Sequence, residues 1–254
     1  MTTPLNRLLA ATLLLASLAA QAAPVTSQGS WWGTDGTNGT LRARDINGHA
    51  VALGDGSAAF FYDTQADLTW QRAMSTGTMN WSAAVAWADA LTTGGFDDWR
   101  LPAVIDSGAA GCNYSTYKTD CGYNVQTQVG SAYSEWAHLY YDVLGNKAFV
   151  KTDGTRDYGG NWGLSNTAYF DNMQANGNWS GTEYVSQGAG DAWAFYTSDG
   201  SQGRNYKDYR NYAAAVRSGD VLRQANAVPE PQSLALALVA LAGLGATLTR
   251  RRAA

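Results

Sequence analysis

Four Asp-Gly pairs, which begin at Asp35, Asp55, Asp153 and Asp199, divide this chain into short segments. Aspartate accepts hydrogen bonds from nearby backbone N–H groups and glycine adopts a positive φ without steric cost, so such pairs favour tight turns between short strands. The 28 glycines of the chain add further turns, and its 10 Trp and 14 Tyr supply core area in large pieces. We therefore expect a compact domain with short strands and long loops.

The N-terminal segment, residues 1–22, is typical of an export signal. It combines Arg7 with a short apolar run over Leu8–Ala20 and the small-x-small pattern Ala-Gln-Ala that ends at Ala22. The run is too short to be a membrane-spanning helix. We expect cleavage after Ala22, or alternatively after Ala23, and export across the inner membrane.

The C-terminal segment, residues 223–254, consists of a linker, the trio Pro229, Glu230 and Pro231, an apolar run and Arg250–Arg252. The run has only about fifteen residues, fewer than the roughly twenty that span a bilayer comfortably. These parts, in this order, resemble the PEP-CTERM sorting signal of Gram-negative bacteria. The resemblance implies an exosortase as processing partner, transient membrane insertion of the C-terminal helix and cleavage near the trio. The destination would be the cell surface or extracellular matrix, and a retained C-terminal anchor is the alternative.

Removing residues 1–22 and the tail from Val228 onward leaves about 205 residues, which is enough for one sizeable core. The whole chain has 17 Lys and Arg against 21 Asp and Glu, a formal net charge of −4, and its basic residues form no stripe. Nucleic acid is therefore not an expected partner.

The two cysteines, Cys112 and Cys121, are separated by only nine positions. In an exported protein such a pair is expected to form a local disulfide that pins one loop. A metal or redox pair is the alternative, but the Cys-x-x-Cys spacing is missing and both histidines are distant in sequence. No metal site and no cofactor are expected.

Two helices are predicted from the spacing of apolar residues and from their capping residues. The first covers residues 80–91, with Asn80 as N-cap and Gly94-Gly95 as its stop. The second begins at Ser134 and ends at Gly145, and its apolar face includes Trp136.

Strands are predicted on both sides of these helices. We expect a first strand over residues 41–53, a hairpin over 59–72 and a buried strand over 96–102, where Pro102 prevents a helix. Residues 192–200 and 211–221 are expected to pair as a second hairpin, joined by a long polar connection. Two helices with short antiparallel strands and long loops indicate the α+β class.

Seven segments carry a resemblance to a known bacterial module. They are LTWQ (68–71), NWSAAVAWADAL (80–91), GFDDWRLP (95–102), EWAHLYYDVLGN (135–146), NWSGTEY (178–184), AWAFYTSDG (192–200) and AAAVRSGDV (213–221). In this order they resemble the Lcl-type C-terminal domain family, over residues 45–222, with residues 23–44 as a leader. The most specific motif positions are Trp99, Arg100, Leu101, Pro102, Trp179, Ser180, Thr182, Val216 and Arg217.

The resemblance implies a C-type-lectin-like fold, in which the first and last strands of the domain lie together and the loops between 153 and 210 form the binding surface. The triplets that hold calcium in sugar-binding C-type lectins are missing from the domain, so calcium-dependent sugar binding is not expected. The closely spaced Cys112 and Cys121 also do not match the copper-binding cysteines of the formylglycine-generating relatives.

No motif of a known catalytic centre is present in the sequence, neither a Gly-x-Ser-x-Gly elbow nor a Walker loop nor His-Glu-x-x-His. His138 is expected to be structural. Adjacent strand residues point to opposite faces, so Asp97-Asp98 is a poor two-carboxylate catalyst, and we expect one of them to pair with Arg100 or a backbone N–H. Arg100 and Arg217 are each expected to form a structural ion pair.

Five aromatic residues lie in polar segments near the end of the domain and are the candidate binding residues: Tyr158, Trp162, Tyr206, Tyr209 and Tyr212. Aromatic rings mixed with Asn, Asp, Arg and Lys suit stacking on sugar rings or on a protein partner. The leading hypothesis is an exported surface or matrix protein that binds a glycan, such as an exopolysaccharide, or a protein partner without catalysis. The alternatives are an exported carbohydrate-active enzyme and a purely structural component of the envelope or biofilm.

Overall fold

The computed structural model describes residues 39–108, 112, 114, 120–125, 134–167, 169–186 and 189–222. The predicted signal peptide, most of the leader, the turn at Asp35 and the predicted sorting signal with Pro229, Glu230 and Pro231 lie outside the described residues. The helical elements are α1 (Trp81–Asp89), η1 (Thr93–Gly95), α2 (Glu135–Ala137) and η2 (His138–Val143). The strands are β1 (Leu41–Asp45), β2 (Ala58–Asp63), β3 (Leu68–Gln71), β4 (Gly122–Tyr123), β5 (Gly177–Glu183), β6 (Asp191–Tyr196), β7 (Ser201–Tyr206) and β8 (Val216–Ser218).

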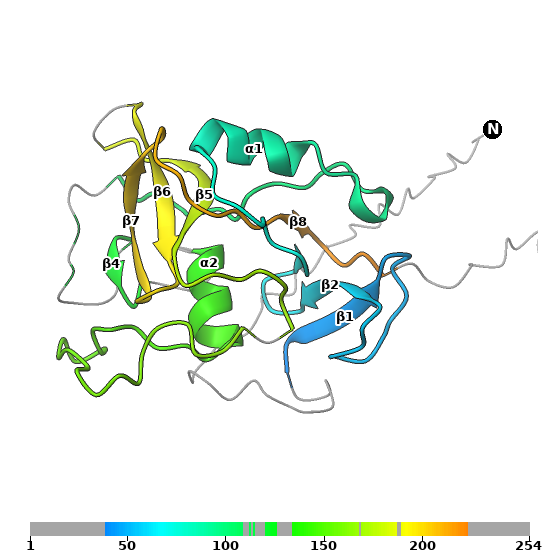
Figure 1. The fold of residues 1–254 in the computed structure, drawn as a ribbon, viewed down its shortest axis with the longest axis horizontal. Coiled ribbons are helices and arrows are strands. Elements are labelled where there is room, and N and C mark those ends of the chain that lie inside the picture. The colour runs from blue at the N-terminus through cyan, green and yellow to red at the C-terminus, as the bar shows by residue number, and fades with distance from the viewer. Residues whose placement is uncertain are drawn as a thin grey trace, which may run out of the picture.

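Two antiparallel four-stranded sheets and few helices make up the fold, which is α+β and mostly sheet. The sheets lie on opposite sides of the molecule, with α2 between them and α1 along one edge (Figure 1). The first sheet has the order β1-β2-β3-β8. Its β2–β3 hairpin confirms the one predicted over 59–72, and β3 pairs with β8 from Leu68↔Ser218 to Trp70↔Val216. The start and end of the domain therefore lie together, as expected from the resemblance.

The second sheet has the order β4-β7-β6-β5 and corrects one strand pairing. The predicted partner of β6 was the segment 211–221, but β6 pairs with β7, which lies inside the supposed polar connection. The polar sequence of β7 misled the prediction, because Gln202 is fully buried and satisfies its amide with Ser134 and the backbone of Asp120. Segment 211–221 instead supplies β8 to the first sheet.

Two further strand predictions were wrong in extent. The predicted strand over 41–53 ends at Asp45, because the chain turns at Gly48 (φ 82°) and returns along β1 through an Arg44↔Ala50 bridge. This strand spans the expected boundary between leader and domain at residues 44 and 45. The predicted strand over 96–102 forms a single bridge, Arg100↔Val216, among the described residues rather than a ladder.

The Asp-Gly turns at Asp55, Asp153 and Asp199 share one geometry. In each, the carboxylate Oδ1 accepts hydrogen bonds from both the backbone N–H and the hydroxyl of the Ser or Thr two positions later. Gly200 at the β6–β7 turn has φ 77°, and a Cβ there would lie 2.9 Å from both Ala148 Cα and the Tyr141 hydroxyl. Only glycine therefore fits this turn without rearrangement.

Both predicted helix starts are confirmed by their caps. The Asn80 side chain accepts from the N–H of Ala83, and the Ser134 side chain accepts from the N–H of Ala137. The first helix ends at Asp89, earlier than predicted. The second widens into the π-helix η2, in which the N–H of Leu144 bonds to the carbonyl of Leu139.

Tryptophans form the centre of the core. Trp70, Trp136 and Phe195 lie in one apolar cluster between the sheets, and Trp99 and Trp179 lie in a second cluster under α1. All five side chains are 0–2% exposed, so their removal would leave large cavities.

His138 in η2 is buried between two carboxylates and links η2 to the first sheet. Its Nε2 lies 2.7 Å from Oδ2 of Asp63 at the end of β2, and its Nδ1 lies 3.1 Å from Oδ2 of Asp142. Burial opposes protonation, but the hydrogen bonds and charges of Asp142 and Asp63 outweigh it and raise the pKa of His138 to about 9. The structural role predicted for His138 is confirmed, with a charged imidazolium.

The raised pKa makes stability depend on pH. A histidine with a folded-state pKa of about 9 contributes its full stabilisation below about pH 6.5, its ordinary unfolded pKa, and loses it as pH rises through about 9. We expect the free energy of unfolding to fall between pH 7 and pH 9.5, as measured by urea denaturation.

The His138→Gln variant should be less stable at pH 7 and should lose this slope, whereas the exposed-site variant His49→Gln should keep it. A wild-type free energy of unfolding that stays flat over this range would contradict the assignment.

Candidate functional site

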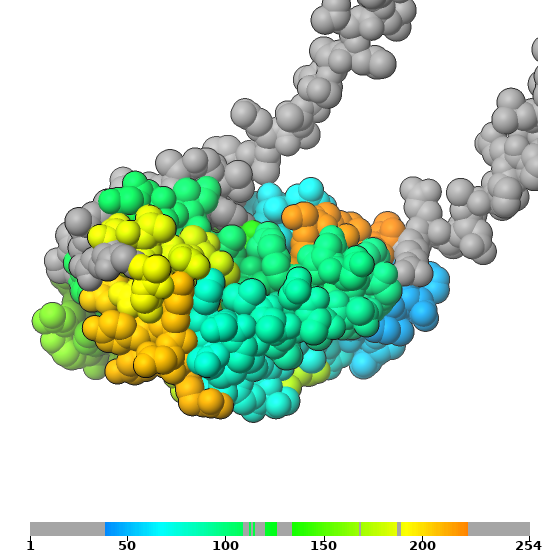
Figure 2. Space-filling view, turned by 90° about the horizontal axis from the view of Figure 1, so that it is seen from above, coloured from blue at the N-terminus to red at the C-terminus, as the bar shows by residue number. Residues whose placement is uncertain are grey.

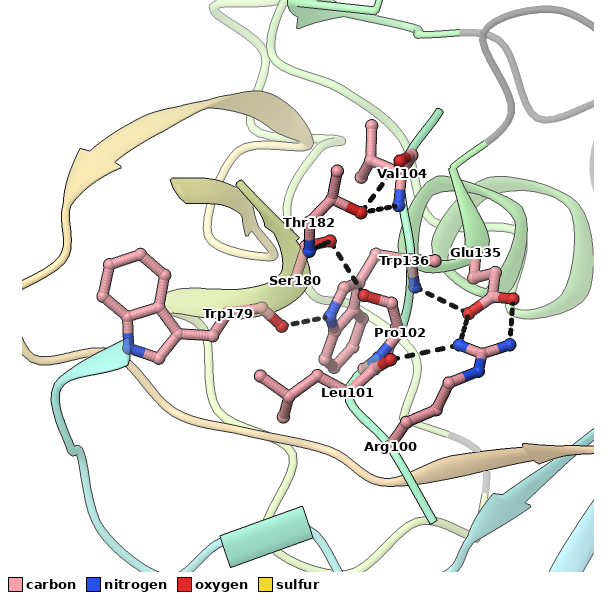
Figure 3. A network of polar contacts seen from close by, with 10 residues as sticks. Arg100, Leu101, Pro102, Val104, Glu135, Trp136, Trp179, Ser180 and Thr182 are labelled. Carbon is pink, nitrogen blue, oxygen red and sulfur yellow. Dashed lines mark hydrogen bonds and ion pairs between the residues drawn. The ribbon is translucent and has the colours of Figure 1, made fainter. Parts of the chain in front are cut away.

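The motif residues around Pro102 form a structural clamp (Figure 3). The two Nη atoms of Arg100 lie 2.7 and 2.8 Å from the two carboxylate oxygens of Glu135, whose Oε2 also accepts from the N–H of Ala103 at 2.7 Å. Glu135 is 6% exposed and stands in the first turn of α2. Arg100 thus fastens the segment before Pro102 to the start of α2.

The second motif segment, on β5, holds the same strip of chain from the other side. Ser180 Oγ donates to the carbonyl of Pro102 at 2.8 Å, and Thr182 Oγ1 bonds both to the carbonyl and to the N–H of Val104 at 2.9 Å. Trp136 Nε1 donates to the carbonyl of Trp179 at 3.1 Å (Figure 3). These hydrogen bonds join β5, α2 and residues 100–104, so the motif residues maintain the fold.

Arg217 on β8 forms the second expected ion pair. Its Nε and Nη2 donate to the two oxygens of Asp98 at 2.8 and 3.0 Å, and its guanidinium lies 4.2 Å from the ring centre of Phe96. Arg217 therefore lowers the pKa of Asp98, mainly by this hydrogen bonding. Of the two partners expected for an acid of the Asp97-Asp98 pair, Arg100 is occupied by Glu135, and Asp98 bonds to Arg217 and to its own backbone N–H.

A cleft of about 430 Å³ lies beside the C-terminal part of β7, where Arg204, Asn205 and Tyr206 line it. Its volume is within the usual range for small-ligand sites. Its described lining residues contain no Asp or Glu, and they are Cys112, Tyr114, Tyr184, Arg204, Asn205, Tyr206 and Tyr209.

Two stacked tyrosines form the mouth of this cleft. The rings of Tyr206 and Tyr209 have centroids 6.0 Å apart and an interplanar angle of 28°, and each residue is 56% exposed. The segment that follows β7 lies against the start of α1, where the N–H of Trp81 bonds to the carbonyl of Lys207 (Figure 2). The Tyr206–Tyr209 pair is therefore exposed, while the segment that carries it is anchored to α1 by the backbone hydrogen bond of Lys207.

Arg204 places a fixed positive charge inside the cleft. Its guanidinium carbon lies 5.8 Å from the ring centre of Tyr206 and 6.0 Å from that of Tyr184. The hydrogen bond to the buried carboxylate of Asp191 raises the pKa of Arg204 and holds its side chain in place. Arg204 has five donor N–H groups, more than its hydrogen bonds to Asp191 and Tyr206 use, so donors remain for a ligand.

The predicted disulfide borders the same cleft. Cys112 and Cys121 are bonded, with Cα atoms 4.7 Å apart. Cys121 is fully buried, whereas Cys112 lines the cleft together with Tyr114. The Tyr114 hydroxyl lies 2.9 Å from where a Cβ on Gly203 would be, so glycine at 203 makes room for it.

The structure separates the five predicted binding residues into three places. Tyr206 and Tyr209 share the cleft. Tyr158 and Trp162 pack on Phe149 instead, with ring centroids 5.7 and 4.9 Å from it. Tyr212 does not line the cleft, and its backbone bonds to Gly177 and Trp179 on β5.

Four lining residues were missed by the sequence analysis: Tyr114, Tyr184, Arg204 and Asn205. Arg204 and Tyr206 stand two positions apart and therefore on one side of β7, a signal that was hidden because this segment was interpreted as a loop. Tyr114 and Tyr184 come from distant segments that only the fold brings together.

A second hollow of about 310 Å³ lies beside β4, with Asn124, Lys147, Lys151, Thr152, Asp153 and Asp157 in its wall. Thr155 donates from its hydroxyl and its N–H to Asp153 and lowers the pKa of that carboxyl. A lowered pKa is the opposite of what a general acid needs at neutral pH, so Asp153 acts as a turn residue.

Among the described residues, no group of three or more His, Cys, Asp or Glu is arranged to hold a metal ion, and no helix is long and apolar enough to cross a membrane. The predicted C-terminal helix lies outside these residues. Comparison with known proteins finds no matching family model, no matching curated protein and no matching solved structure.

The two arginine pairs predict different costs for their loss. Glu135 is buried, so Glu135→Gln should reduce the free energy of unfolding by about 2–3 kcal/mol, somewhat below the range for fully buried pairs because Arg100 is partly exposed. Asp98 is largely exposed, so the matched variant Asp98→Asn should cost about 0–1 kcal/mol. Urea denaturation measures both, and equal costs would contradict the clamp.

Proposed function

We propose that this chain is an exported, exosortase-sorted surface or matrix protein whose domain, with a C-type-lectin-like fold, binds a glycan in the cleft along β7 without catalysis. The observation that carries the proposal is the exposed, stacked Tyr206–Tyr209 pair beside Arg204. A hydrophobic ring that is more than half exposed at the mouth of a cleft is best explained by a ligand that covers it.

The chemistry of the cleft suits a sugar. A pyranose ring has an apolar C–H face, which packs on an aromatic ring, and equatorial hydroxyls, which need donors and acceptors at its edge. Tyr206 and Tyr209 offer the face, while Arg204 and Asn205 offer polar groups from the same strand. A flat protein surface would not fill the hollow of about 430 Å³ that these four residues line.

The alternative of a carbohydrate-active enzyme has less support. A glycosidase of the usual kind places two carboxyl groups on either side of the scissile bond. The described lining of the cleft contributes none, and the nearby Asp191 is occupied by Arg204. The cleft can therefore hold a sugar without a pair of groups to cleave it.

Binding is tested with a glycan array and with Tyr206→Ala and Tyr209→Ala variants. Because both side chains are exposed, each variant should keep the wild-type unfolding midpoint and bind the selected glycan at least tenfold more weakly. Tyr169→Ala, an exposed tyrosine outside the cleft, is the matched control and should bind normally. Wild-type affinity in both cleft variants, or cleavage of the glycan, would contradict the proposal.

Sorting is tested separately from binding. Mass spectrometry of the protein recovered from the cell surface or medium should give an N-terminus at Ala23 or Pro24 and a C-terminus close to Pro229–Pro231. Deletion of the exosortase should leave the C-terminal segment in place. A surface-located protein that keeps residues 232–254 in the presence of the exosortase would support the anchor alternative.

A further inference from the structure

The cleft is one end of a longer row of aromatic rings. Tyr114, which lines the cleft, lies 6.1 Å from Tyr123 on β4, and Tyr123 lies 6.4 Å from Phe149, measured between ring centroids. Phe149 in turn contacts Trp162 at 4.9 Å and Tyr158 at 5.7 Å. The row therefore connects the two groups of predicted binding residues that the sequence treats as one set.

This row of aromatic rings follows the second sheet from β4 along β7 to the cleft. Tyr123 pairs with Ser201 at the start of β7, and Asn205, four positions further on and therefore on the same face, lines the cleft. At about 3.4 Å per residue, these four steps span about 14 Å, longer than one sugar ring. In Figure 1 the loop of residues 146–167 lies beyond β4, so the rings on this loop extend the row further.

The surface along this row is exposed and hollow at two places. Tyr114 is 51% exposed and Tyr158 is 81% exposed, which is unusual for rings that serve only as core. The hollow of about 430 Å³ lies at the Tyr206 end, and the one of about 310 Å³ includes Asn124 and Ala148, the neighbours of Tyr123 and Phe149. Polar side chains line both hollows, so each suits a hydroxyl-rich ligand.

We propose that the ligand is a linear polysaccharide whose chain extends from Tyr206 and Tyr209 along β7 and β4 to Tyr158 and Trp162, several sugar units at once. This inference rests on the proposed function, because it assigns a second contact region to the same glycan. Interior segments of a chain are bound, and affinity rises with chain length until both regions are occupied.

The test measures binding of the full chain to sugars of two lengths. The probes are the dimers and hexamers of β-1,4-linked glucose, xylose and N-acetylglucosamine and of α-1,4-linked glucose, by isothermal titration calorimetry. For at least one sugar the hexamer should bind at least tenfold more tightly than the dimer. Tyr158→Ala and Trp162→Ala should weaken hexamer binding at least threefold and leave dimer binding unchanged, whereas Tyr206→Ala should weaken both.

The results separate the inference from the proposed function. Hexamer and dimer affinities that are equal, or a Tyr158→Ala protein that binds the hexamer like wild type while Tyr206→Ala weakens it, would overturn the extended row and leave the cleft standing. No binding of any probe, or unchanged binding in Tyr206→Ala, would overturn both. Tyr158 is 81% exposed, so a misfolded variant is not expected, and Tyr169→Ala again serves as control.

Discussion

The ion pair between Arg100 and Glu135 is the interaction on which the arrangement of the second sheet depends. Glu135 is nearly buried, so it needs the guanidinium of Arg100 and the N–H of Ala103 to compensate its lost hydration. Together these bonds fix the strip from Arg100 to Val104, and β5 then attaches to that strip through Ser180 and Thr182. Strands β6 and β7 follow in register, so the cleft beside β7 inherits its position from contacts made at β5, two strands away.

Local signals in the sequence were sufficient for the elements that depend on neighbouring residues. The caps Asn80 and Ser134, the turn at Asp199 and the disulfide Cys112–Cys121 each need only a few positions, and the structure confirms all of them. The pairing of β6 with β7 was missed because the alternation of apolar and polar residues reveals a strand only where its buried side chains are apolar. Gln202 breaks that rule by finding its partners, Ser134 and Asp120, far away in the sequence.

The candidate site shows the same limit. Composition directed attention to exposed aromatics, and Tyr206 and Tyr209 do lie together. Tyr184 directly follows β5 whereas Arg204 lies on β7, and their proximity follows from the sheet order, which periodicity does not encode. The nine motif positions led to the scaffold instead, because a motif that maintains a fold is more constrained in sequence than a surface that contacts a ligand.

Strand β7 separates two tasks along its length. Gln202 near its start is buried and tied to Ser134, whereas Tyr206, four positions further on the same face, is more than half exposed. A substitution of Tyr206 leaves the buried hydrogen bonds of Gln202 unchanged, and a substitution of Gln202 changes no exposed surface. The end of β7 that lines the cleft can therefore change its side chains by single mutations while the buried start of the strand holds the sheet together.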